Sequence, residues 1–99
     1  MINKSNIVFL GRTLKDTLKR AKITHIDKDN YEDVLKVVNK EIEFIDNKNI
    51  PLEKKLILIE PLKKNIKRIS VYLNNDNVSH LEYDAETNDW YYVLEGGEN

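Results

Sequence analysis

The chain of 99 residues has no cysteine, only two prolines and three glycines, and no long apolar run. The absence of cysteine excludes disulfide bonds, thiolate metal sites and thiol nucleophiles. No segment approaches the ~20 apolar residues that a membrane-spanning helix needs, and the run from Ile7 to Leu10 is too short for a signal-peptide core. We therefore expect a cytoplasmic protein.

A chain of this length can bury one hydrophobic core, and a second domain would have too little apolar surface of its own. We expect a single α+β domain over residues 1–95, followed by a flexible tail at residues 96–99. The abundance of lysine, isoleucine and asparagine is typical of an AT-rich coding sequence. Together with the small size, it fits a viral or mobile-element protein.

Charge is present in quantity, and it is unevenly distributed. The net charge is −1, but residues 1–22 carry +5, residues 23–50 carry −3, residues 51–68 carry +4 and residues 69–99 carry −7. The last of these segments contains no Lys or Arg. Such asymmetry bears on the choice of partners rather than on the fold.

Two helices are indicated in the first half of the chain. Apolar residues recur every three or four positions from Ser5 to Ala21, with Ser5 as the N-cap and Gly11 as a weak point. The same spacing runs from Tyr31 to about Asp46, after candidate caps in residues 27–30. The basic residues of the first segment then form its outer surface.

The third segment is ambiguous. Helical spacing continues from Leu52 to Ile69, but Pro61 interrupts it, and the residue before a proline favours an extended conformation. Residues 54–60 fit either a helix or a short buried strand. We favour a helix that is kinked or broken near Glu60.

The rest of the chain alternates between apolar and polar residues, which is typical of strands. Strands are expected at residues 69–74, 78–83 and 90–94, with turns at 74–77 and 84–89. The predicted fold class is α+β, with two to three N-terminal helices packed on a C-terminal three-stranded antiparallel β-meander.

The chain has few residues of the types that act as nucleophiles or bases, and we expect neither an enzyme nor a cofactor. Ser79 and His80 are adjacent on a predicted strand, so their side chains point to opposite faces and do not form a nucleophile–base pair. The acidic run from Asp84 resembles a calcium loop but has Asp89 where the loop requires glycine. His25 and His80 look like isolated surface residues, so we expect no metal site.

The basic segments suggest a regulator that binds nucleic acid through its helices. The chain has few arginines, the residue that most often contacts bases, and its isoelectric point is about 6.1. A solvated lysine-rich face is therefore the competing interpretation. The candidate residues are Lys15, Lys19, Arg20, Lys63, Lys64, Lys67 and Arg68.

The acidic C-terminal third supports our first hypothesis, a non-enzymatic protein-binding module that acts as a small inhibitor or regulator. Its hairpin combines aromatic anchors with acidic groups, which suits docking onto a basic, nucleic-acid-handling protein as a phosphate mimic. Alternation places Trp90 and Tyr92 on one face of the strand and Tyr91 on the other, so some aromatic surface should stay exposed. The proposed contact residues are Tyr83, Asp84, Glu86, Asp89, Trp90 and Tyr92.

Two further interpretations of the charge split remain open. The acidic sheet neutralises the basic helices of the same molecule, or it meets the basic face of a second copy in a small homo-oligomeric structural protein. The sequence does not identify the partner or the oligomeric state.

Overall fold

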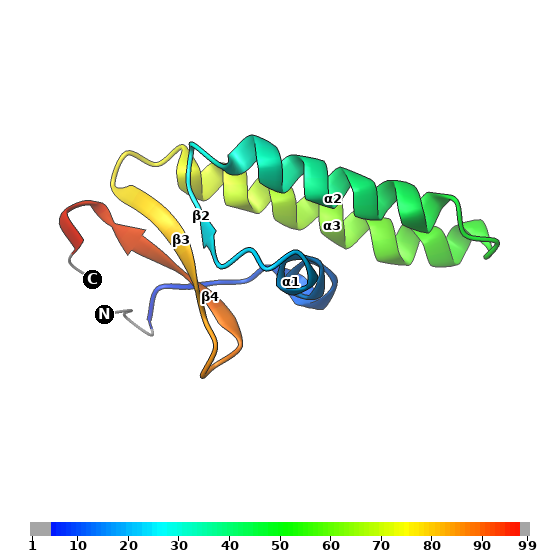
Figure 1. The fold of residues 1–99 in the computed structure, drawn as a ribbon, viewed down its shortest axis with the longest axis horizontal. Coiled ribbons are helices and arrows are strands. Elements are labelled where there is room, and N and C mark those ends of the chain that lie inside the picture. Colours follow the sequence, from blue (N-terminus) through cyan, green and yellow to red (C-terminus); the bar gives the residue numbers. More distant parts are fainter. Residues whose placement is uncertain (1–4, 98–99) are drawn as a thin grey trace.

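The computed structural model describes residues 5–97, in which helices and strands form an α+β fold (Figure 1). The elements follow one another as β1 (Ile7–Val8), α1 (Gly11–Arg20), β2 (His25–Ile26), α2 (Tyr31–Asp46), α3 (Leu52–Leu73), β3 (Val78–Asp84), β4 (Asp89–Leu94) and a 3-10 turn (Glu95–Gly97). The predicted fold class, α+β, is confirmed.

Within the described residues, the strands form one antiparallel sheet in the order β1-β4-β3-β2. The β3–β4 hairpin is its centre, with Tyr83 opposite Trp90. The two short edge strands are added from the N-terminal half: Val8 pairs with Trp90, and Ile26 pairs with Leu81. Sheet formation therefore joins the two ends of the described chain.

The three helices lie against this sheet as a layer that extends beyond it. Figure 1 shows α2 and α3 side by side as a long helical hairpin, with α1 seen nearly end-on next to them. The sheet lies at the end of the hairpin where α2 begins and α3 ends. Core residues at most 1% exposed come from every helix and strand: Val8, Leu10, Leu14, Leu18, Ile26, Val34, Val38, Leu62, Ile69, Leu81 and Trp90.

The third helix corrects two expectations. It runs from Leu52 to Leu73 through Pro61, so the favoured helix is confirmed without a break near Glu60, and the strand at residues 69–74 was wrong. Residues 54–60 are helical. The exposure at the end of the segment explains why: Ile69 and Leu73 are buried, whereas Val71 between them is 65% exposed, which is helical rather than alternating burial.

The number of strands is the other correction, since the sheet has four strands where three were expected. β1 and β2 lie in segments that we had assigned to the first helix and to a link. α1 consequently begins at Gly11 rather than at Ser5. The second helix spans Tyr31–Asp46, as predicted.

At the far end of the helical hairpin, large apolar side chains are exposed: Phe44, Leu52, Leu56 and Ile57. The described part of the chain contains no helix with the length and apolarity needed to cross a membrane. Gly96 and Gly97, from the expected tail, belong to the 3-10 turn, and residues 98–99 lie outside the described residues.

Candidate functional site

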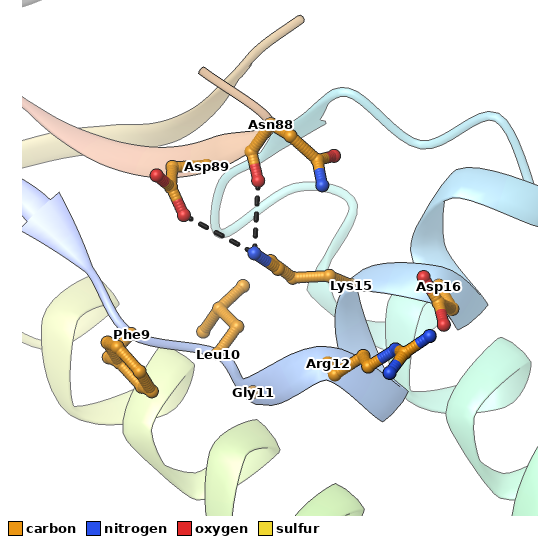
Figure 2. Close-up of a pocket in the computed structure, with 8 residues that line it drawn as sticks. All are labelled: Phe9, Leu10, Gly11, Arg12, Lys15, Asp16, Asn88 and Asp89. Atoms are coloured by element: carbon orange, nitrogen blue, oxygen red, sulfur yellow. Dashed lines mark hydrogen bonds and ion pairs between the residues drawn. The ribbon is translucent and has the colours of Figure 1, made fainter.

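A large hollow lies where the chain leaves the sheet and enters α1 (Figure 2). This groove has a volume of about 470 Å³. Its lining comes from the β1–α1 junction, the first turns of α1 and the start of β4: Phe9, Leu10, Gly11, Arg12, Lys15, Asp16, Asn88 and Asp89. We call it the α1 groove.

The floor of the α1 groove is a tight turn that requires glycine. Gly11 has a φ of +73°, and a Cβ atom there would lie 2.7 Å from Nδ2 of Asn65, a buried side chain on α3. Arg68, also on α3, donates hydrogen bonds to the carbonyl oxygen of Phe9 and to Oδ1 of Asn65. The junction is therefore held in place by α3 on one side.

Lys15 closes the other side. Its Nζ donates a hydrogen bond to the carbonyl oxygen of Asn88 at 3.0 Å and pairs with Oδ1 of Asp89 at 3.3 Å, as Figure 2 shows. Through this contact the basic helix α1 reaches the β3–β4 loop. One acidic group of the hairpin is thus paired with a basic residue of the same molecule.

A second groove, of about 410 Å³, adjoins the first. It shares Phe9 and Gly11 with the α1 groove, and its other lining residues come from the middle of α3: Glu60, Pro61, Lys64, Asn65 and Arg68. Phe9 stands at the boundary of the two grooves with 72% of its surface exposed. We refer to Phe9, Arg12, Lys15, Lys64 and Arg68 together as the Phe9 surface.

The Phe9 surface unites three of the seven basic residues that the sequence suggested for nucleic-acid binding, Lys15, Lys64 and Arg68. The other four lie elsewhere. Lys19 lines a small pocket beside Tyr83, and Arg20 pairs with Glu41 of α2 at 3.0 Å. Lys63 and Lys67 are exposed on α3 and are not among the described residues that line either groove.

Phe9 and Arg12 were absent from the candidate residues. Phe9 lies inside the segment that we assigned to the first helix. An aromatic residue between apolar neighbours in a helix is normally a packing residue, so nothing marked Phe9 as a binding residue. The local signal that could have found it is Gly11, which weakens a helix at that point and is better explained as a turn after a short strand.

The aromatic residues of the acidic hairpin are less accessible than expected. Trp90 is 1% exposed and packs against Tyr83 in the core, with 5.8 Å between the ring centroids. Tyr91, on the opposite face, is buried as well. Tyr92 stacks on Tyr72 of α3 at 5.4 Å. The expected exposed aromatic face is not found at Trp90 or Tyr91.

The acidic residues of the hairpin do not form one patch. Asp84, Glu86 and Asp89 lie in or beside the β3–β4 loop, whereas Asp76 and Glu95 lie at the other end of the hairpin. Strand β3, of seven residues, spans roughly 20 Å between them. Asp84 also accepts a hydrogen bond from the backbone N–H of Glu86, which shapes the loop.

One further cluster is present on the sheet. It includes a contact that we had not expected, because Oγ of Ser79 lies 3.0 Å from Nδ1 of His80. The expectation that these two side chains point to opposite faces was wrong, since the strand is irregular between Val78 and His80. Strand pairing brings His25 of β2 next to His80 and Glu82 of β3, and one potential ligand atom from each lies within 4.8 Å of the others. The sequence hid this cluster because His25 is far along the chain from His80 and Glu82, and no spacing motif connects it with them.

Comparison of the chain with protein-family models, with curated proteins and with solved structures finds no match.

Proposed function

We propose that the protein is a non-enzymatic nucleic-acid-binding protein, a regulator that takes a single strand on the Phe9 surface. The observation that carries the proposal is the exposed ring of Phe9 between two grooves, with Arg12 and Lys15 on one side and Lys64 and Arg68 on the other. Proteins that bind single-stranded nucleic acids combine an aromatic ring with nearby cations. The bases stack on the ring, and the cations contact the phosphates.

Carboxylates set a limit to the affinity. Asp16 and Asp89 line the α1 groove, where Asp89 pairs with Lys15, and Glu60 lines the second groove, so the surface is not uniformly positive. We expect few phosphate contacts and therefore a shallow dependence of the binding constant on salt concentration. Stacking on Phe9 should supply a large share of the binding energy.

The test is fluorescence anisotropy with a labelled oligo(dT) or oligo(U) strand at low salt. Phe9→Ala should weaken binding by tenfold or more, since stacking of one base contributes about 1–3 kcal/mol. The matched control is Phe44→Ala, which removes an exposed phenylalanine from the far end of the helical hairpin and should leave binding unchanged.

Two further variants, each of which removes one positive charge, complete the experiment. Lys64→Gln should weaken binding for all sequences and make the salt dependence shallower by about one counterion, whereas Lys40→Gln on α2 should do neither. If the wild-type protein binds no strand at low salt, or if the two phenylalanine variants bind equally well, the proposal is wrong.

The docking of the acidic hairpin onto a basic protein remains a second proposal. Exposed Glu86 at the tip of the β3–β4 loop and the lack of Lys and Arg after residue 68 favour it. The burial of Trp90 and the Lys15–Asp89 contact count against it. Glu86→Lys separates the two proposals, because it should abolish capture of a basic partner and leave strand binding intact.

A homo-oligomer is the third proposal. Leu52 and Leu56, one helical turn apart and both exposed, are the apolar surface that favours association with a second copy.

A further inference from the structure

The outer face of the sheet carries two histidines and a carboxylate in contact with one another. His25 on β2 lies opposite Glu82 on β3, and His80 precedes Glu82 by two residues on the same strand. These side chains alternate with the buried Ile26 and Leu81, so they lie on the face away from the core. The imidazole rings are stacked, with centroids 4.5 Å apart and an interplanar angle of 29°.

Each histidine has one ring nitrogen held by a neighbouring polar group. Nε2 of His25 lies 2.8 Å from Oδ2 of Asp27, and Nδ1 of His80 lies 3.0 Å from the hydroxyl oxygen of Ser79. Histidines that bind metals almost always donate their second N–H to such a partner, which fixes the tautomer and the ring orientation. Here those partners leave Nδ1 of His25 for a metal ion, and Nε2 of His80 faces Oε1 of Glu82 at 3.2 Å, a contact that a metal ion between the two atoms would replace.

The carboxylate that orients His25 is itself fixed. Oδ1 of Asp27 accepts hydrogen bonds from the backbone N–H groups of Asp29 and Asn30, at 2.9 and 3.0 Å. Asp27 is therefore a rigidly placed acceptor for the ring of His25.

We propose that His25, His80 and Glu82 bind a zinc ion, with Asp27 and Ser79 as the groups that orient the two histidines. Two imidazoles and one carboxylate, without a thiolate, form a donor set that zinc accepts. Ligand atoms of a tetrahedral zinc ion lie about 3.3 Å apart, and Nε2 of His80 is already 3.2 Å from Oε1 of Glu82. The potential ligand atom of His25 lies within 4.8 Å of the other two, so a shift of this exposed side chain that keeps its contact with Asp27 would bring in the third ligand, and a water molecule would take the fourth position.

Such a site would act as a clamp on the sheet. Its ligands come from two strands, and β2 is only two residues long and lies at the sheet edge. Zinc would therefore hold the segment between α1 and α2 on β3, and binding would stabilise the folded protein. The proposal is independent of strand binding at the Phe9 surface.

The test is calorimetric titration of the untagged, full-length protein with zinc chloride in a non-chelating buffer. We expect one ion per chain, and each of His25→Gln and His80→Gln should weaken binding by at least tenfold. Glu86→Gln is the matched control, since it removes an exposed carboxylate from the adjacent loop and should leave zinc binding unchanged.

A second measurement tests the clamp. Zinc should raise the melting temperature of the wild-type protein and slow amide hydrogen exchange at Ile26, and His25→Gln should lose both effects. Because His25 is exposed, this variant should match the wild type in melting temperature when EDTA is present. Equal zinc affinity in wild type and His25→Gln, or no slowing of exchange at Ile26 in saturated protein, would overturn the proposal.

Discussion

The sheet end of the molecule and the far end of the α2–α3 hairpin are packed very differently. At the sheet end, side chains from three helices and four strands surround Leu18, Leu81 and Trp90, which are at most 1% exposed. At the far end, Ile45 and Ile59 are buried, but Phe44 and Ile57 nearby are mostly exposed. One end is a core and the other is a pair of helices in solvent.

This contrast shows where the stability of the fold resides. Free energy of folding comes largely from apolar area removed from water, and most of that area is buried where helices meet the sheet. Ile45 and Ile59 join the far end to the core. We therefore expect substitutions at the exposed positions of the far end to cost less stability than substitutions at the sheet end.

The largest difference between the two ends should appear when one leucine at each end is replaced by alanine. Leu81→Ala, at a position with 0% exposure, should lower the free energy of unfolding by about 2–5 kcal/mol, because it removes buried methyl groups and leaves a cavity. Leu52→Ala, where the side chain is 68% exposed, should change it by less than about 0.5 kcal/mol. Urea denaturation measures both, and similar losses would contradict the contrast.

A pair of glycine substitutions tests how tightly the sheet end is packed. Both Gly11 and Gly96 have positive φ angles, so alanine is strained at either position by roughly 1 kcal/mol. Gly11→Ala also drives a Cβ atom into Asn65, whereas nothing lies within 4 Å of a Cβ atom at Gly96. We expect Gly11→Ala to lower the free energy of unfolding by about 2–3 kcal/mol in total and Gly96→Ala by about 1 kcal/mol.

The smallest effect concerns the polar contacts of α1. Lys15→Gln removes the contact with the β3–β4 loop and should cost up to about 1 kcal/mol, since both partners are partly shielded from solvent. Arg20→Gln removes a more exposed pair with Glu41 of α2 and should cost less than about 0.5 kcal/mol. Thermal unfolding compares them, and a larger loss for Arg20→Gln would show that α1 is anchored mainly on the helices.

The sequence predicted the elements that rest on local patterns. The second helix was found with its correct bounds because its apolar spacing is regular and turn-forming residues precede it. The β3–β4 hairpin followed from alternation on both sides of the loop at residues 84–89. Both patterns are local, because the residues that form each pattern belong to the helix or strand that it predicts.

The errors arose where distant parts of the chain decide. Strands β1 and β2 are two residues long, too short for any periodicity, and they exist because β4 and β3 pair with them. Residues 69–73 fit both a strand and a helix, and packing of Ile69 and Leu73 on the core selects the helix. Pro61 is tolerated because burial of Ile59 and Leu62 holds both of its sides in the helix.

The same contrast between local patterns and distant contacts applies to the candidate sites. The sequence pointed to Lys15, Lys64 and Arg68 through charge alone, without indicating that they surround Phe9. His25 and His80 were noticed as single residues and treated as isolated, because their contact depends on the pairing of β2 with β3. Charge is visible in a sequence, but proximity between strands is not.

The pairing of β1 with β4 also has a consequence for biosynthesis. The carbonyl oxygen of Tyr92 accepts a hydrogen bond from the side chain of Asn6, 86 residues away along the chain. During translation, α1 and the α2–α3 hairpin can leave the ribosome and associate while the partner of β1 is still unmade. Until β4 emerges, the apolar residues destined for the sheet remain uncovered, so completion of the fold awaits synthesis of nearly the whole described chain.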